Sequence, residues 1–135
     1  MADKNITVEI VTPERVVFSE PVDFVVVPGV EGYLGILPMH APIVSGINNG
    51  IIKVITDGVQ TKISTSGGFL EVNKDKVVIL AETAERGDEI DVIRAKAARE
   101  RAEQRLANRT ADIDVARAEL ALRRALIRLK AVGQD

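Results

Sequence analysis

The chain has 135 residues and a formal net charge of −2, and it contains no cysteine. This length accommodates one domain, or one small domain with an appendage. The lack of cysteine excludes disulfides, thiolate metal sites and cysteine nucleophiles, and it suits a reducing compartment. No apolar run approaches the roughly 20 residues that a membrane span needs, and no secretory signal layout opens the chain. We therefore expect a cytosolic protein that docks onto a partner without inserting into a membrane.

The composition changes at Gly87. All five prolines, all four aromatic residues and eight of the ten glycines come before this position, and strong helix formers dominate after it. Turn formers and β-branched residues favour strands, whereas Ala, Arg, Leu and Glu favour helices. The sequence therefore predicts a β body over residues 1–87 and a helical tail over residues 88–135.

Short apolar stretches separated by turn residues run through the β body. The expected strands span residues 6–10, 16–18, 24–27, 51–55, 61–64, 69–72 and 77–81. Breaks are expected at Pro13, at Glu20-Pro21 and at Pro28-Gly29. Many short strands spaced by about ten residues indicate an antiparallel β-sandwich or barrel.

Residues 29–42 are the segment richest in glycine and proline. Their glycine spacing, G-x-x-G-x-x-G, is not that of the dinucleotide fingerprint, and a strand run follows in place of a helix. A tight turn and a crossing of strands explain the segment. We therefore interpret His40, the single histidine, as a structural hydrogen-bonding residue and not as a ligand.

The sequence of the tail predicts two amphipathic helices. Because residues 108–110 make only a short connection between them, we expect an antiparallel hairpin. We expect Asp88 to cap the first helix, with Asp91 in its first turn, and Thr110 to cap the second, with Asp114 in its first turn. Two apolar stripes follow helical spacing. They consist of Ala95, Ala98, Ala102 and Leu106, and of Val115, Ala118, Leu122, Ala125, Leu129 and Val132.

Alanine dominates the first of these stripes, so the hairpin is expected to close weakly. Full burial of a larger aliphatic side chain contributes roughly 1.5–3 kcal/mol, and a methyl group contributes only a fraction of that. Both helices also have good intrinsic propensity. The hairpin can therefore open without melting its helices, as a two-state switch requires.

The charge is distributed unevenly between the two parts. Residues 1–87 carry a net charge of −4 and residues 88–135 a net charge of +2, with nine arginines in the tail. Arginine pairs well with carboxylates and phosphates. The tail is therefore either an anion-binding element or simply a solvated helix pair with interspersed charges.

Catalytic signatures are missing. The sequence has no phosphate-binding loop, no His-Glu-x-x-His and no nucleophile elbow, and one histidine cannot build a multi-histidine metal site. We expect no catalytic residues, no metal site and no required cofactor. An enzyme that uses carboxylates alone is the remaining catalytic alternative.

Several segments resemble the ATP synthase epsilon subunit family. Residues 35–42, Gly-Ile-Leu-Pro-Met-His-Ala-Pro, are similar to its Gly-Ile-Leu-Pro-Gly-His-Ala-Pro segment, and residues 66–72, 77–81 and 117–122 match later signatures in order. Met39 replaces the usual glycine and Tyr33 a common glutamate, which affects local turn geometry only. The resemblance covers essentially the whole chain and implies a β-sandwich followed by a helical hairpin.

This resemblance also implies a function. In a bacterial F-type ATP synthase, the sandwich of residues 1–87 would bind the gamma subunit and the rotor c-ring, at the cytoplasmic face of the cell membrane and peripheral to it. The hairpin of residues 88–135 would extend towards the alpha/beta catalytic head and inhibit ATP hydrolysis. Arg123, Arg124 and Arg128 would contact acidic residues there.

A second implication concerns ATP as a regulatory ligand. Residues 90–95, Ile-Asp-Val-Ile-Arg-Ala, resemble the Ile/Leu-Asp-x-x-Arg-Ala motif by which some bacterial epsilon subunits bind ATP, and a helix N-terminus beside Arg94 favours anions. In this motif Asp91 accepts a hydrogen bond from the adenine amino group. The simpler interpretation is a capping Asp91 and a surface Arg94. The resemblance assigns ATP binding to Ile90, Asp91, Arg94, Ala95, Glu85, Arg101, Arg124 and Arg128.

Two alternatives from other functional classes remain. A free-standing ATP-sensing module would keep the nucleotide site without a complex, and an exposed apolar patch on the sandwich would argue against it. A nucleic-acid binder would use the arginine-rich hairpin on phosphates. Acidic residues interleave with those arginines and no aromatics accompany them, so nucleic acid is not an expected partner.

Overall fold

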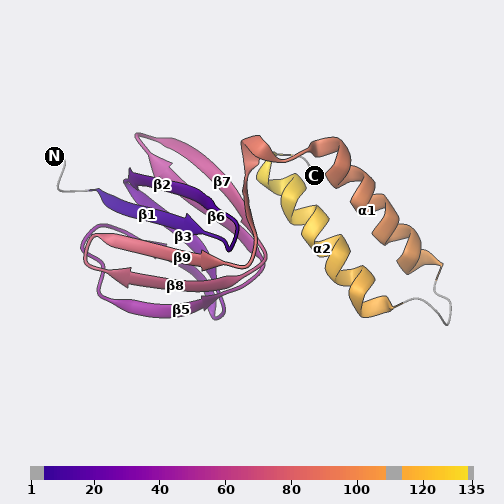
Figure 1. Cartoon of the computed structure of the whole chain (residues 1–135), viewed down its shortest axis with the longest axis horizontal. Coiled ribbons are helices and arrows are strands. Elements are labelled where there is room, and N and C mark those ends of the chain that lie inside the picture. The colour runs from indigo at the N-terminus through magenta and orange to yellow at the C-terminus, as the bar shows by residue number, and fades with distance from the viewer. Residues whose placement is uncertain (1–4, 109–113, 134–135) are drawn as a thin grey trace. The chain divides into compact units, whose positions relative to one another are not determined.

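The computed structural model describes residues 5–108 and 114–133, and Figure 1 shows their secondary structure. The chain divides into two compact units, Met1–Arg86 and Gly87–Asp135. The first unit is built from strands and the second from helices. The division lies one residue before the boundary that the composition indicated, and each unit is considered by itself below.

The β unit contains ten strands within its described residues. They are β1 (Ile6–Val11), β2 (Val16–Val22), β3 (Phe24–Gly29), β4 (Gly32–Ile36), β5 (Ile43–Ile47), β6 (Gly50–Thr56), β7 (Val59–Thr65), β8 (Gly68–Asn73), β9 (Lys76–Ala81) and β10 (Ala84–Arg86). Their order is β10-β7-β6-β3-β5-β8-β9-β1-β2, and β4 pairs with β3. A single residue pair, Gly29 with Ile47, joins β3 to β5, and the sheet folds into two layers there (Figure 1). The predicted sandwich is confirmed.

The register in which neighbouring strands pair places every second residue, which is apolar, on the inner face of the sheet. In β1 and β9, the parallel pair in this sheet, Val8 lies beside Val77 and Ile10 beside Ile79. All four side chains are fully buried. Because side chains alternate between the two faces of a strand, the residues between them point outward. The core therefore lies between the two layers.

Two sequence expectations for the β unit were wrong. Strand β2 continues through the predicted break, with Pro21 paired opposite Thr7. This is tolerated because β2 is the last strand in the sheet order, where the missing N–H of proline leaves no ladder bond unmade. Residues 32–36 form β4, although their glycines indicated a turn, whereas β5 at residues 43–47 agrees with the strand run expected after residue 42.

Gly68 shows how closely the strands approach where β8 begins. Its φ is +151°, and a Cβ at this position would fall on the carbonyl oxygen of Leu80 in the neighbouring strand. Only glycine combines this backbone conformation with the absence of a side chain. The close approach brings Phe69 and Leu80 into register on the outer face.

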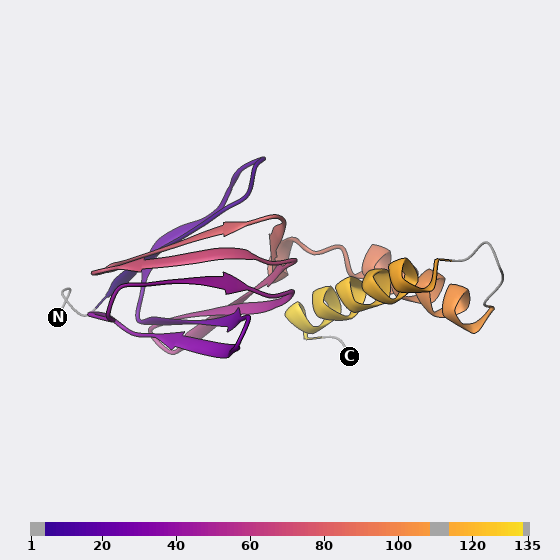
Figure 2. The same ribbon diagram turned by 90° about the horizontal axis from the view of Figure 1, so that it is seen from below.

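The helical unit consists of a short 3-10 turn, η2 (Gly87–Glu89), and two helices, α1 (Val92–Ala107) and α2 (Val115–Ala131). The helices lie side by side and antiparallel in both views (Figures 1 and 2), which confirms the predicted hairpin. The helix residues that are buried follow the predicted stripes, with one addition at the end of α2. They are Ala95, Ala102, Ala118, Ala125, Leu129 and Ala131.

Candidate functional site

The first helix begins at the predicted nucleotide motif. Asp91 is the N-cap of α1, and its Oδ1 accepts a hydrogen bond from the backbone N–H of Arg94 at 3.0 Å. The predicted cap, Asp88, was wrong. Asp88 lies in the η2 turn, whose Ile90 N–H donates to the Gly87 carbonyl at 3.4 Å, so the helix cannot begin until after this turn.

Capping leaves Asp91 able to bind a ligand as well. Its side chain is exposed, and an ionised carboxylate offers about four acceptor sites, of which the hydrogen bond to Arg94 occupies one. The capping interpretation and the ligand interpretation of Asp91 are therefore compatible.

The second helix begins in the same way as the first. Asp114 is the N-cap of α2, and its Oδ1 accepts from the backbone N–H of Arg117 at 3.0 Å. The prediction that Asp114 lies in the first turn was wrong. Thr110, the predicted cap, lies outside the described residues. The sequence signal was available, because Asp114 through Ala118 repeat the Asp-Val-x-Arg-Ala pattern of Asp91 through Ala95.

Arginines occupy a regular position relative to the buried contacts of the hairpin. Five of the six buried helix residues are directly preceded by an arginine, and the sixth, Ala131, by Lys130. Each residue advances about 100° around an α-helix, so these arginines lie beside the helix contact and not within it. The five are Arg94, Arg101, Arg117, Arg124 and Arg128.

These arginines all lie on one face of the hairpin. Two antiparallel helices are related by a two-fold axis perpendicular to the plane that contains them, and such an axis keeps equivalent positions on the same face. Arg105, which directly precedes the half-buried Leu106, falls on this face by the same rule. We call the six residues the arginine face. Arg128 is half-buried and the other five are exposed.

Acidic side chains lie elsewhere on the two helices. Glu103 and Glu119 directly follow the buried Ala102 and Ala118, which places them on the opposite face. Glu103 there lies 3.7 Å from Arg99 in an ion pair, and Glu100 lies on the outer side of α1. Acidic and basic residues alternate along the sequence, but in the hairpin they lie on different faces. One face is basic, and the other carries both signs of charge.

The predicted ATP-binding residues divide into three groups. Arg94, Arg101, Arg124 and Arg128 share the arginine face, with Asp91 at its edge. Ile90 is 8% exposed and Ala95 is fully buried, so these two residues pack and do not present a polar group. Glu85 is half-buried in β10 and belongs to the other unit.

Sequence reasoning missed two members of the arginine face and grouped a third arginine differently. Arg105 and Arg117 belong to the face although the nucleotide motif does not include them. Arg123 was grouped with Arg124 and Arg128 as an inhibitory contact, yet it lies two positions before the buried Ala125 and therefore on the outer side of α2. Arg105 and Arg117 could have been found from the sequence, because each directly precedes a residue of the predicted apolar stripes.

The β unit carries an exposed apolar surface on the layer that contains β5, β8, β9, β1 and β2. Phe69 of β8 pairs directly with Leu80 of β9, and Leu80 is joined through Val11 to Val16 at the sheet edge. Val44 of β5 lies one row away. The four exposed side chains, which we call the outer patch, are Val16 (59%), Val44 (73%), Phe69 (64%) and Leu80 (57%).

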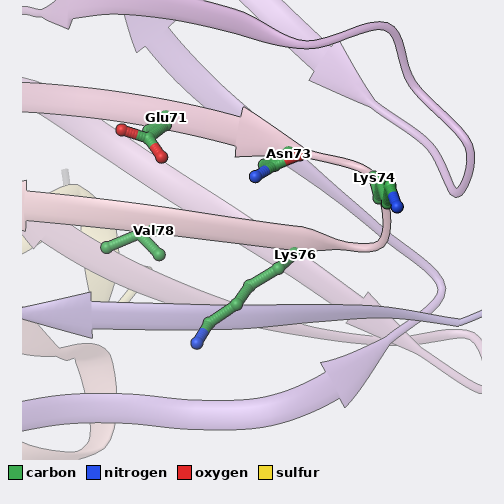
Figure 3. A pocket seen from close by; sticks show the side chains of 5 residues that line it. All are labelled: Glu71, Asn73, Lys74, Lys76 and Val78. Atoms are coloured by element: carbon green, nitrogen blue, oxygen red, sulfur yellow. The ribbon is translucent and has the colours of Figure 1, made fainter.

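Four of the five residues that line a shallow depression beside the outer patch have polar or charged side chains. The depression has a volume of about 380 Å³ and is lined by Glu71, Asn73, Lys74, Lys76 and Val78 of the β8–β9 hairpin (Figure 3). Lys76 forms an ion pair of 3.3 Å with Glu9. None of the residues singled out from the sequence lines this depression.

The interpretation of His40 as a structural residue stays a prediction, and one hydrogen-bonding contact of its ring is consistent with it. Its Nδ1 lies 2.6 Å from the Ala41 carbonyl oxygen, and the residue is half-buried. Within residues 5–108 and 114–133, no group of three His, Cys, Asp or Glu side chains could hold a metal ion. No helix in the same residues has the length and apolar character needed to cross a membrane.

Comparison with known families gives a match over both units. Residues 5–87 match the ATP synthase, Delta/Epsilon chain, beta-sandwich domain, and residues 88–133 match the long alpha-helix domain of the same chain. The division between the two matches falls at the same place as the change in composition.

Individual relatives agree with the family match. The chain is 59% identical over 134 residues to the ATP synthase epsilon chain of Pelotomaculum thermopropionicum, covering 99% of this chain and 100% of that one. It is 63% identical over 110 residues to that of Carboxydothermus hydrogenoformans, covering 82% and 81%. Among solved structures, a chain of the Euglena gracilis mitochondrial ATP synthase matches with a TM-score of 0.78 and 26% identity, covering 95% of this chain and 81% of that one.

Proposed function

The chain belongs to the ATP synthase delta/epsilon family, and we propose that it is a non-catalytic subunit of the rotating central stalk in a bacterial F-type ATP synthase. The observation that carries the proposal is the family match over residues 5–87 and 88–133. High identity to bacterial epsilon chains over nearly the full length supports the same role. In this role the chain couples rotation to ATP synthesis without supplying catalytic residues.

The β unit would dock onto the gamma subunit and the rotor c-ring. The outer patch supports this assignment, because contiguous exposed apolar surface marks interaction sites on soluble proteins. The same patch argues against the alternative of a free-standing ATP-sensing module, which would have no reason to expose Phe69 and Leu80. Docking of this kind makes the chain a peripheral component at the cytoplasmic side of the membrane complex.

The helical unit would act as a brake on ATP hydrolysis. Alanines make up most of the buried contact between α1 and α2, so little apolar area holds the hairpin closed. An opened tail could reach the alpha/beta catalytic head, where Arg123, Arg124 and Arg128 would meet acidic residues. The brake is engaged by the extended tail and released by the closed hairpin.

ATP would favour the closed hairpin as a regulatory ligand. Arg94 and Arg101 of α1 and Arg124 and Arg128 of α2 share one face only when the helices are packed together. Their like charges repel, and a triphosphate bound between the two helices would convert this repulsion into attraction. Asp91 would supply selectivity by accepting a hydrogen bond from the adenine amino group.

The docking assignment is tested by size-exclusion chromatography with the cognate gamma subunit. The full chain should co-elute with gamma, with or without ATP, and the Phe69→Ser/Leu80→Ser variant should lose co-elution. Val59→Ser is the matched control, because Val59 is similarly exposed at 66% but lies on β7 in the other layer. Co-elution of the Phe69→Ser/Leu80→Ser variant as efficient as that of the control would contradict the outer patch as the docking surface.

A further inference from the structure

The two helices of the hairpin are an internal repeat. Residues 90–107 align without gaps with residues 113–130 at a spacing of 23, and ten of the 18 positions are identical. All three arginines that α1 contributes to the arginine face have a counterpart in α2 at this spacing. The pairs are Arg94 with Arg117, Arg101 with Arg124, and Arg105 with Arg128.

This repeat gives the arginine face an approximate two-fold symmetry. Arg94 lies two residues after the start of α1 and Arg128 three residues before the end of α2, so they share one end of the hairpin. Arg105 lies two residues before the end of α1 and Arg117 two residues after the start of α2, so they share the other end. Arg101 and Arg124 lie between these ends.

Both ends therefore carry the same basic groups. Each consists of one arginine from each helix, and the central pair lies between the two ends. Glu103 and Glu119, the acidic side chains nearest the Arg105 end within α1 and α2, fall on the opposite face. A guanidinium binds phosphate oxygens through two parallel hydrogen bonds, and the Arg105 end offers such groups from both helices.

The two ends are far enough apart to be occupied together. Arg94 and Arg105 are 11 residues apart, which corresponds to a rise of about 16 Å along the helix. The Debye length at physiological ionic strength is about 8 Å. Salt therefore screens most of the repulsion between an anion at one end and an anion at the other.

We propose that Arg105 and Arg117 form a second binding site for a polyphosphate chain at the end of the hairpin opposite Asp91. The site takes an inorganic polyphosphate or the triphosphate of a nucleotide. At this end Asp114 caps α2 as Asp91 caps α1 at the other end, and the contacts proposed for the second ligand are those of the arginines with its phosphate oxygens.

The test is calorimetric titration of the full chain with sodium tripolyphosphate. The wild-type chain should bind two equivalents, and the Arg105→Ala/Arg117→Ala variant should bind one. The Asp91→Ala/Arg94→Ala variant should also bind one, at the remaining Arg105 end. Lys96→Ala/Lys130→Ala is the matched control. Lys96 directly follows the buried Ala95 and Lys130 the buried Leu129, which places both on the face opposite the arginines, so this variant should keep two equivalents.

Alanine is the strongest helix former and Arg105 and Arg117 are exposed, so the double variant should keep its helix content by circular dichroism. Binding by this variant that equals the control in stoichiometry and affinity would overturn the second site. A wild-type stoichiometry of one would overturn it as well. Two equivalents in the Asp91→Ala/Arg94→Ala variant would instead contradict the ATP site while leaving the second site standing.

Discussion

At the scale of single residues, Asp91 and Asp114 perform the same structural task in different surroundings. Each is an N-cap whose carboxylate accepts a 3.0 Å hydrogen bond from the third residue of its helix. Loss of such a cap costs about 1 kcal/mol of stability. The two residues therefore form a matched pair in which capping can be separated from ligand binding.

We predict that Asp91→Ala and Asp114→Ala destabilise the hairpin by similar amounts but differ in nucleotide selectivity. Asp114→Ala should still bind ATP more tightly than tripolyphosphate, because it retains the acceptor for the adenine amino group. Asp91→Ala should bind the two ligands equally. Calorimetric titration measures the affinities, and thermal unfolding followed by circular dichroism measures the stabilities. Unchanged ATP preference in Asp91→Ala would reduce Asp91 to a cap.

The residue scale also shows what sequence reasoning could reach. Helical spacing identified Ala95, Ala102 and Leu129 as contact residues, because burial follows the period of the helix. The start of α1 was displaced by one turn, since Asp88 and Asp91 are both good capping residues and only the η2 turn decides between them. The face that each arginine occupies depends on how the two helices pair, and the periodicity of a single helix does not contain this information.

At the scale of elements, local composition predicted long regular segments better than short ones. The helices and the apolar strands were found, whereas β4 and β10 were not. Strand β4 contains Gly32 and Gly35 and forms through its hairpin pairing with β3, and β10 consists of three residues held by β7. Pairing with a neighbour, not intrinsic propensity, creates these strands.

We predict that the amide hydrogens of α1 and α2 exchange with solvent more readily than those of the central strands. The opening that allows this exchange should have a lower free energy in the helices than in the strands. The hairpin contact buries mainly alanines, so its opening exposes little apolar area, and helices that have lost their partner fray from their ends. By contrast, Val8, Leu70 and Ile79 of β1, β8 and β9 are fully buried in the sandwich. Native-state hydrogen exchange measures both free energies, and saturating ATP should raise the value for the helices only.

Equal protection of helices and strands in the absence of ligand would contradict this prediction. Such a result would mean that the alanine contact holds the hairpin as firmly as the core holds the sandwich. The closed hairpin could then not open on its own, and a brake that depends on opening would need a partner to pull the helices apart.

At the scale of the whole molecule, the two units have surfaces suited to different kinds of partner. The β unit presents an apolar patch and the helical unit a basic face, and the chain divides between Arg86 and Gly87. Apolar burial suits a lasting contact, whereas charge pairing on an exposed face responds to salt and to competing anions. This contrast favours a fixed attachment through the sandwich and a reversible contact through the tail.

The last prediction concerns removal of residues 88–135 in a reconstituted stalk and catalytic head. The truncated chain should still bind gamma, since the outer patch lies entirely within residues 1–87, and ATP hydrolysis should rise because the brake is absent.

The full chain should inhibit ATP hydrolysis less as the ATP concentration increases, because a ligand at 100 times its dissociation constant stabilises the closed state by about 2.7 kcal/mol. The full chain with Arg123, Arg124 and Arg128 replaced by alanine should resemble the truncated chain, whereas Lys96→Ala/Lys130→Ala should inhibit normally. Hydrolysis that is identical with and without the tail, measured at limiting ATP where the hairpin is most often open, would leave the helical unit without an inhibitory role.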